Sequence, residues 1–401
     1  MLSTGSAARG SFEFDSIDAD YADGVDGAIQ GAFNEGVTKP FAIIRIVTTP
    51  HRFEEVAGAP GLPGHWFALD IDKTGSATSI PTWHAQLQPN GFPAHSRGVT
   101  TNITYLGTDR DGGPAGPVPR SVGAAVTKQA TVPIVVIAAC ALPSSPNAAQ
   151  TIASVLGSVT GVTTLRVRDV GQASFSSLCD KDGKAVLHYD VGFPISFNGH
   201  TSPNNFDLDE TEKPPVVLSH WDWDHLHAAF LHPHLKDCVW LVPDQKLGPG
   251  AARLARILAA KGRLLIHPAG TLTAFPNGEV AHASGPRASL NDAGLTVRVA
   301  LASGRSVLLT GDVDYSFLAH PSIGSLNYLV ATHHGARFAS GQAAIPAPVR
   351  ESGTLLLSYG KRNVYRHPHP DAIKLHTRAG WVYQISTARN GTQLRGDREV
   401  N

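Results

Sequence analysis

The sequence has few cysteines, no long apolar run and no excess of charge of either sign. Only three cysteines occur among 401 residues, at positions 140, 179 and 238, and none forms a Cys-x-x-Cys pair. That spacing excludes a disulfide framework and a thiolate metal cage, so we expect buried, reduced thiols. The longest apolar run, residues 132–142, is far shorter than the roughly 20 residues that a membrane-spanning helix needs.

The charges cancel, because 33 Lys and Arg stand against 33 Asp and Glu. Zero net charge excludes the uniformly basic surface of a protein that coats nucleic acid, although it is compatible with a local basic groove. The first residues contain no apolar stretch of the signal-peptide type and become acidic, so we expect no secretory signal. Together with the reduced thiols, these features predict a cytoplasmic protein with no membrane partner.

The chain does contain enough apolar residues for a core, and many turn-forming residues. Hydrophobic residues make up 42% of it, and 40 glycines and 28 prolines indicate a loop-rich fold. Its length suggests two domains. All but four of the 19 histidines lie after residue 159, and a Pro- and Ser-rich stretch at 143–146 precedes this change. We therefore predict an N-terminal domain at residues 1–159 and a second domain at residues 160–401.

Residues 1–159 are predicted to be rich in β-strands. The patterns at 41–47, 66–71 and 102–106 are typical of strands, and the continuous apolar run at 132–139 predicts a fully buried strand. No cluster of chemically reactive side chains occurs in this part. Its role stays open, and one hypothesis is that it binds a protein partner.

The second part alternates apolar strands with polar turns. Strands are predicted at 164–170, 174–179, 185–189, 216–218, 307–309, 328–330 and 354–357, and a helix at 251–261. Four of these strands run directly into polar or His/Asp-containing turns: Ser219–His220, Thr310–Asp312, Ala331–His334 and Ser358–Gly360. This pattern favours a layered α/β fold, which places a site at the ends of its strands.

The densest group of reactive side chains is His220-Trp-Asp-Trp-Asp-His225, directly after a short apolar strand. Two imidazoles and two carboxylates within six residues can converge on one point, as divalent metals require. A solvated polar turn would not need this spacing. The sequence therefore predicts metal binding here. The two tryptophans could line a pocket or pack in the core.

This run resembles the His-x-His-x-Asp-His signature of the metallo-β-lactamase superfamily, with Asp222 in place of the second histidine. The His-x-Asp-x-Asp-His form resembles the hydrolase domain of ComEC-type competence proteins, and also bacterial phosphorylcholine esterases. Other segments resemble family motifs in the same order: Asp169–Gln172, Tyr189–Gly192, Leu308–Asp312, His333–Gly335 and Ser358–His369. Ala173 and Arg366 stand where those motifs have glycine. Residues 1–159 show no such resemblance.

The resemblance implies an αββα sandwich for residues 160–401, with two divalent metal ions. The implied ligands of the first ion are His220, Asp222 and one of His333 and His334. Those of the second are Asp224, His225 and His367, with Asp312 bridging both ions. Two cations about 3.5–4 Å apart can hold a bridging hydroxide as the nucleophile and stabilise the developing negative charge.

The roles of the surrounding residues are less defined. Asp190 would orient a ligand through a hydrogen bond, and Asp224 could steer a proton. His369 could be a ligand, a general acid for the leaving group or a bystander. Replacing imidazole with the Asp222 carboxylate makes the site harder, which moves its preference from zinc toward manganese or magnesium, so zinc and manganese both stay open.

The substrate is inferred from charge. Residues 350–401 hold nine basic and four acidic residues, and Lys361 and Arg362 lie beside Asn363 in the segment that leads to His367. Cations beside a metal centre suit a phosphate group. The leading hypothesis is a phosphodiesterase or nuclease that acts on a phosphate-containing substrate such as single-stranded nucleic acid. The alternatives are a hydrolase of small esters, such as lactones or phosphorylcholine esters, and a sensor or effector module that binds a partner through residues 1–159.

Overall fold

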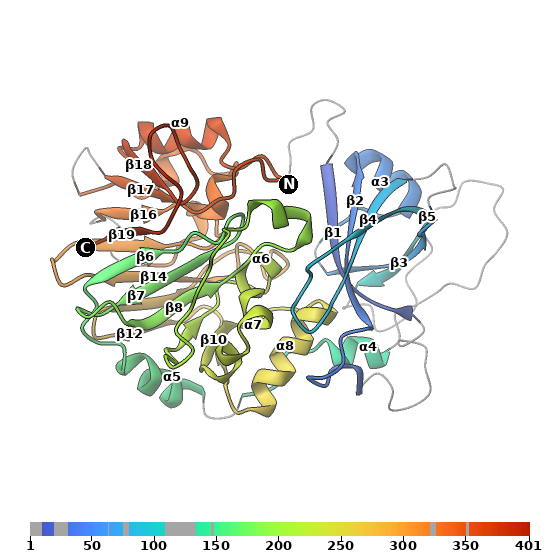
Figure 1. The fold of residues 1–401 in the computed structure, drawn as a ribbon, viewed down its shortest axis with the longest axis horizontal. Coiled ribbons are helices and arrows are strands. Elements are labelled where there is room, and N and C mark those ends of the chain that lie inside the picture. The colour runs from blue at the N-terminus through green and yellow to red at the C-terminus, as the bar shows by residue number, and fades with distance from the viewer. Residues whose placement is uncertain are drawn as a thin grey trace. The chain divides into compact units, whose positions relative to one another are not determined.

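The computed structural model describes residues 10–19, 31–62, 64–74, 80–108, 134–145, 148–320, 326–349 and 353–401. The chain forms two compact units, and each contains strands (Figure 1). Unit 1 comprises Met1–Ala141 and Lys246–Leu254, and unit 2 comprises Leu142–Gln245 and Ala255–Asn401. The mixed α/β class expected from the sequence is confirmed. Within the described ranges, every helix is too short or too polar to cross a membrane.

Unit 1 is built around one antiparallel sheet with the strand order β1-β2-β4-β5-β3. Its strands are β1 (Gly10–Ile17), β2 (Phe41–Thr48), β3 (His65–Asp72), β4 (Ile80–Gln86) and β5 (Ser96–Thr108). The strands predicted at 41–47, 66–71 and 102–106 are thus found. Helix α3 (Pro50–Ala57) starts at Thr49, whose hydroxyl accepts a hydrogen bond from Arg52 N, and places Phe53 in the apolar core with Ile46 of β2.

The prediction of a buried strand at residues 132–139 is wrong. Residues Ile134–Ala139 form helix α4, on which Val135 is 49% exposed while Val136 is buried. A continuous apolar run of this length does not distinguish a buried strand from a helix, because both can bury such residues. Residues 132 and 133 lie outside the described residues.

Unit 2 contains two seven-stranded sheets. The first has the spatial order β11 (Leu264–His267), β10 (Trp240–Pro243), β9 (Val216–Val217), β8 (Ala185–Val191), β7 (Phe175–Cys179), β6 (Thr164–Val167) and β19 (Arg398–Val400). The second has the order β12 (Leu272–Phe275), β13 (Gly278–His282), β14 (Leu295–Ala300), β15 (Ser306–Leu309), β16 (Tyr328–Val330), β17 (Thr354–Leu357) and β18 (Tyr383–Ser386). Parallel pairing joins β8 to β11 through β9 and β10, and β15 to β18 through β16 and β17.

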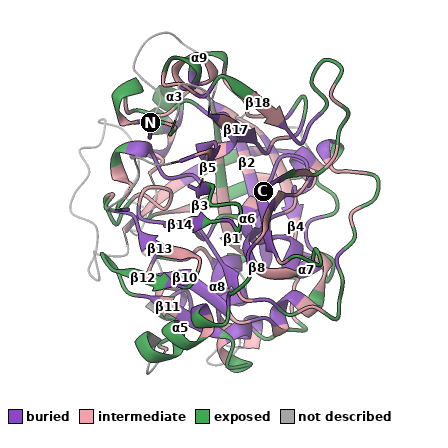
Figure 2. Ribbon diagram, turned by 90° about the vertical axis from the view of Figure 1, so that its left-hand side faces the viewer, coloured by how far each residue is buried: buried purple, intermediate pink, exposed green. Residues whose placement is uncertain are grey.

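One apolar core contains side chains of both sheets. Leu187 and Val217 of the first sheet share a cluster with Val297, Leu309 and Val330 of the second. Figure 2 labels β8 and β14 of these strands and colours them mostly as buried. Alternate residues of a strand point to opposite faces of the sheet. Leu308, which directly precedes Leu309 on β15, therefore belongs to a separate cluster.

Two helices pack against the sheets of unit 2. Helix α9 (Pro370–Arg378) places the partly buried Ile373 in the cluster that contains Leu308, on the other face of the second sheet. Trp381, which follows this helix, is buried in the same cluster. Helix α5 (Ala148–Gly157) contacts β11 and β12, one edge strand from each sheet. The helix predicted at 251–261 is α8 (Pro249–Ala260), whose Leu254 and Leu258 are buried.

A buried histidine on α9 makes the fold sensitive to acid. His376 donates from Nδ1 to the carbonyl oxygen of Ala372 at 2.7 Å and accepts at Nε2 from Tyr315 Oη at 2.6 Å, so both nitrogens are used by the neutral ring. Burial lowers the pKa of His376 from 6.5 to about 4. The unfolded chain therefore binds a proton between pH 6.5 and 4 that the folded protein does not bind.

The stability that depends on His376 should be complete above pH 6.5 and fall as the pH drops toward 4. The predicted loss is up to about 3 kcal/mol in the free energy of unfolding. Urea unfolding at several pH values would measure it. His376→Gln should flatten this part of the profile, whereas His51→Gln, at an exposed position, should not. An unchanged slope in His376→Gln would contradict the prediction.

Candidate metal centre

The predicted ligands come from turns that follow parallel strands of both sheets. His220 follows β9 of the first sheet, and Asp224 and His225 lie on the adjoining short helix α6 (Trp223–Leu226). Asp312 follows β15 of the second sheet, and the pair His333–His334 follows β16 in a 3₁₀ turn. The ends of the two sheets therefore deliver these side chains to one place.

The first group consists of His220, His225 and Asp312, each of which offers a ligand atom within 4.8 Å of the others. Asp312 Oδ1 lies 3.3 Å from His225 Nε2, and Asp312 Oδ2 lies 3.9 Å from His220 Nε2. All three residues are buried. The two Nε2 atoms and Asp312 Oδ1 have no hydrogen-bond partner. Leaving such atoms unsatisfied is costly, and a cation between them would remove that cost.

The other ring nitrogens show why the Nε2 atoms face this point. Asp190 Oδ2 accepts a hydrogen bond from His225 Nδ1 at 2.7 Å and another from Ser219 Oγ at 3.0 Å. Ser219 Oγ gives its only proton to that carboxylate, so at 3.0 Å from His220 Nδ1 it must accept from the ring. Both histidines therefore donate from Nδ1, which directs both Nε2 atoms at the centre, the ring orientation that a metal ligand needs.

The second group consists of Asp224, His225 and His334, whose ligand atoms also lie within 4.8 Å of one another. His334 Nδ1 donates to the carbonyl oxygen of Ser358 at 2.8 Å, and its Nε2 donates to Asp224 Oδ2 at 3.2 Å. Burial lowers the pKa of His334, yet this hydrogen bond to Asp224 helps to raise it above its ordinary value. His333 lies beside the first group, with its Nε2 3.3 Å from Asp312 Oδ2, and is more exposed. Both members of the His333–His334 pair therefore reach the centre.

Close backbone approaches hold this geometry. A Cβ atom on Gly192 would lie 1.7 Å from the carbonyl oxygen of Asp224, so only glycine fits there. Asp190, His333 and His334 have φ values of 55°, 48° and 56°, in the left-handed region that residues with a Cβ atom seldom adopt. Strained backbone of this kind tends to concentrate at functional sites.

The electrostatics of the centre favour a cation. Burial raises the pKa of Asp224, but His225 and His334 outweigh burial and lower it to about 2. Burial likewise raises the pKa of Asp312, and the neighbouring imidazoles of His333 and His225 hold it well below its usual range. Burial lowers the pKa of His225, yet the carboxylates of Asp312, Asp190 and Asp224 hold it well above its ordinary value. The carboxylates thus stay ionised and attract positive charge into a buried space.

Two histidines of the site are held neutral. Burial lowers the pKa of His220 to about 3, and His225 adds to this effect. Burial together with His333 and His334 lowers the pKa of His367 to about 3. The ring of His367 lies 5.3 Å from that of His333 and 6.4 Å from that of His334, centroid to centroid. His367 is therefore next to the centre, although neither group of three includes it.

Other predicted residues lie around the centre in different settings. Asp222 is exposed and caps α6, accepting a hydrogen bond from Trp223 N at 2.7 Å, and it belongs to neither group. His369 caps α9 and accepts at Nδ1 from Arg337 Nε at 3.1 Å. Their roles as a ligand and as an acid stay predictions. Trp221 and Trp223 are both buried, so neither offers an open ring face to solvent.

The loop that precedes His367 contains the remaining predicted residues. Asn363 is buried and its side chain bonds both backbone groups of His367, donating to the carbonyl oxygen at 2.7 Å and accepting from N at 3.0 Å. Lys361 and Arg362 are exposed. Sequence reasoning did not assign roles to Ser219, Ser358 or Gln172. Gln172 and Ser358 lie in motifs that resemble those of the family, whereas Ser219 is marked only by its place directly before His220.

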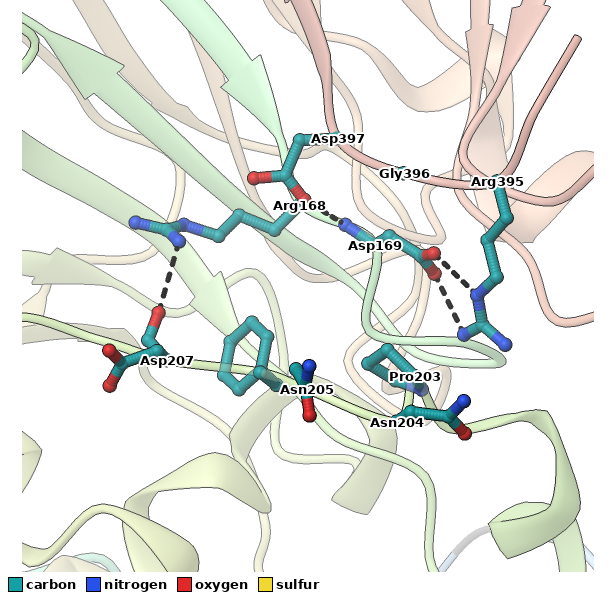
Figure 3. A pocket seen from close by; sticks show the side chains of 10 residues that line it. Arg168, Asp169, Pro203, Asn204, Asn205, Asp207, Arg395, Gly396 and Asp397 are labelled. Carbon is teal, nitrogen blue, oxygen red and sulfur yellow. Dashed lines mark hydrogen bonds and ion pairs between the residues drawn. The ribbon is translucent and has the colours of Figure 1, made fainter.

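A separate cavity of about 430 Å³ opens elsewhere in unit 2, and none of the cluster residues lines it (Figure 3). Four of its charged side chains, those of Arg168, Asp169, Arg395 and Asp397, form hydrogen bonds within the protein. Asp169 accepts from Arg395 Nη2 at 2.9 Å, and Arg168 donates to the carbonyl oxygen of Asp207 at 3.3 Å. Asp397 accepts a hydrogen bond from Asp169 N. This cavity is therefore distinct from the candidate metal centre.

A scan against protein-family models finds no match, and neither does a search of the curated proteins. Among solved structures, the chain is similar to CmlA, a diiron beta-hydroxylase from Streptomyces venezuelae. The similarity covers 60% of this chain and 54% of that chain, with 15% sequence identity and a TM-score of 0.35. Similarity at this level identifies neither a family nor a reaction, so the function proposed below depends on the geometry of the site.

Removing the carboxylate behind His225 should weaken metal binding without unfolding the protein. Asn tolerates the left-handed backbone of Asp190, so Asp190→Asn should keep the fold while losing the negative charge that orients His225. We expect metal affinity to fall about 10- to 100-fold, measured by competition with a chromophoric chelator. Asp182→Asn, in the exposed turn between β7 and β8, is the matched control. Equal affinity in the two variants would contradict this role of Asp190.

Proposed function

We propose that the chain is a metal-dependent hydrolase with a centre for two divalent ions. One observation carries the proposal: three buried atoms, His220 Nε2, His225 Nε2 and Asp312 Oδ1, converge without a hydrogen-bond partner. Two ring nitrogens and a carboxylate oxygen form a donor set that suits divalent transition metals. A merely structural cluster would have satisfied these atoms with hydrogen bonds.

The proposed ligands are His220, Asp224, His225, Asp312, His333 and His334. Asp312 is the bridging residue, because its Oδ1 faces His225 while its Oδ2 faces His220 and His333. Asp190 orients His225 through the hydrogen bond to Nδ1. The donor set is compatible with both zinc and manganese, and neither ion is favoured by geometry alone.

Divalent ions bound in this centre would activate water and polarise the ester group of a substrate. The chain's own residues would arrange the surroundings. Asp224, with 23% of its side chain exposed, is the carboxylate of the centre that solvent reaches, and it can accept a proton from an attacking water. His220, His225 and Asp312 are too deeply buried for that task and fix the geometry instead.

A phosphate ester is the proposed substrate class. Lys361, Arg362 and Arg366 are exposed in the loop between Gly360 and His367. In the described part of the chain, none of the three forms an ion pair with a carboxylate. Arg362 and Arg366 also have φ values of 63° and 64°. Three uncompensated cations on a strained loop beside the centre suit a phosphodiester, such as a single-stranded nucleic acid.

We further propose the metallo-β-lactamase fold for residues 160–401, of the ComEC-like subgroup. The two packed sheets, the helices outside them and the ordered motifs support this assignment. Residues 1–159 are proposed to bind a protein partner.

A hydrolase of lactones or phosphorylcholine esters is the second candidate function. Zero net charge favours it, because a long nucleic-acid groove needs more basic surface.

The direct test is hydrolysis of labelled single-stranded DNA by protein that has been stripped of metal and resupplied with Mn²⁺ or Zn²⁺. Cleavage should require the metal, and Asp224→Ala should lower the rate by at least about 100-fold, because both a ligand and a proton acceptor are lost. Asp182→Ala should cleave like the wild type. Full activity of Asp224→Ala would refute the role of the centre.

Salt dependence should distinguish the two substrate classes. If the loop cations bind a polyanion, the rate at low substrate concentration should fall steeply between 50 and 200 mM salt, on the order of 10-fold or more. The triple variant with Ala at 361, 362 and 366 should lose most of this dependence. A flat response in the wild type would favour the small ester.

A further inference from the structure

His367 faces a different kind of partner from the other histidines of the centre. The Nδ1 atoms of His220, His225 and His334 each point at an acceptor: Ser219 Oγ, Asp190 Oδ2 and the carbonyl oxygen of Ser358. The Nδ1 atom of His367 instead lies 3.5 Å from Nε2 of Gln172. This difference determines which ring nitrogen carries the proton.

The hydrogen bonds of Gln172 allow only one orientation of its amide. Its other terminal atom, Oε1, lies 3.2 Å from the backbone nitrogen of Gly360. A backbone N–H only donates, so the atom that faces it must be the amide oxygen. The NH₂ group of Gln172 therefore faces His367, and Nδ1 must be the acceptor. The ring proton of neutral His367 is then on Nε2.

Gln172 and His367 are both held rigidly in this relation. Gln172 is 1% exposed, and its backbone N donates to Thr201 Oγ1 at 2.9 Å. The Arg395 guanidinium donates to the carboxylate of Asp169 (Figure 3). It also donates to the carbonyl oxygen of Thr201, and so holds the Asp169–Gln172 turn in place. Asn363 fixes the backbone of His367 from the other side.

The Nε2–H group of His367 is left available. The ring is only partly buried, and no group in the described part of the chain forms a hydrogen bond with Nε2. The basic loop residues Arg362 and Arg366 directly precede it in sequence. A fixed N–H donor between this loop and the metal ligands is suited to an anionic oxygen.

We propose that His367 is a catalytic residue that donates a hydrogen bond from Nε2 to a phosphoryl oxygen of the substrate, and that it is not a metal ligand. Gln172 is the positioning residue that selects this tautomer. The assignment rests on the proposed function and names how the same site would hold its substrate. It departs from the ligand role that the family resemblance implies for His367.

Metal content separates the two roles of His367. Zinc-loaded wild type should contain two ions per chain, and His367→Ala should keep both while kcat for a phosphodiester falls about 100- to 1,000-fold, as for the loss of one oxyanion donor. His334→Ala, a ligand by contrast, should lose metal. If His367→Ala loses metal as His334→Ala does, the inference falls and the proposed function stands. If the wild type binds no metal, the proposed function itself fails.

A second experiment reads the tautomer without depending on activity. In ¹⁵N spectra of the zinc-loaded protein, the His367 signals, assigned by their loss in His367→Ala, should show a protonated Nε2 and an unprotonated Nδ1. A proton on Nδ1 would overturn the proposal.

Gln172→Glu should reverse the tautomer, because a carboxylate accepts from Nδ1, and lower kcat with metal retained. Gln384→Glu, a partly buried glutamine on β18, is the matched control. Retained activity in a Gln172→Glu variant whose spectrum shows an unprotonated Nε2 would contradict the donor role.

Discussion

The central constraint on this molecule is the burial of polar atoms that the protein itself does not satisfy. Two histidine Nε2 atoms and a carboxylate oxygen meet between the ends of two sheets without a hydrogen-bond partner. Each such atom costs about 1–3 kcal/mol, so the surrounding structure must hold them there. The buried Asp190 carboxylate is the main means, because it binds Ser219 and His225 together and thereby orients the rings of His220 and His225.

The two-sheet architecture makes this arrangement possible. Ligands that follow β9 and ligands that follow β15 and β16 come from different sheets, which share one apolar core. That core fixes the separation of the strand ends, and therefore the distances among the ligand atoms. The left-handed backbone at Asp190, His333 and His334 and the tight contact at Gly192 are local costs that the packed sheets stabilise.

Histidines in one centre need not share one role. Where Nδ1 faces an acceptor, as in His225 and His334, Nε2 is the nitrogen directed at the centre and its carboxylates, where a cation would bind. Where Nδ1 faces an amide donor, as in His367, Nε2 carries a proton and suits an anion. The partner behind the ring thus decides whether a histidine is matched to the metal or to the substrate.

The sequence by itself predicted the strands that lead into the centre, the polar turns that end them and most of the His and Asp residues that meet there. Alternating and continuous apolar runs report burial directly, and His220–His225 is dense enough to stand out from a polar turn. Only the tertiary structure decided the partners: that Ser219 and Ser358 face ring nitrogens, that Asp222 caps a helix in the open, and that Gln172 lies against His367. Residues 134–139 became a helix for a related reason, because an apolar run states that burial is favourable but not which backbone geometry provides it. The contacts of Ser358 with His334 and of Gln172 with His367 join residues far apart in the chain, and local pattern carries no information about them.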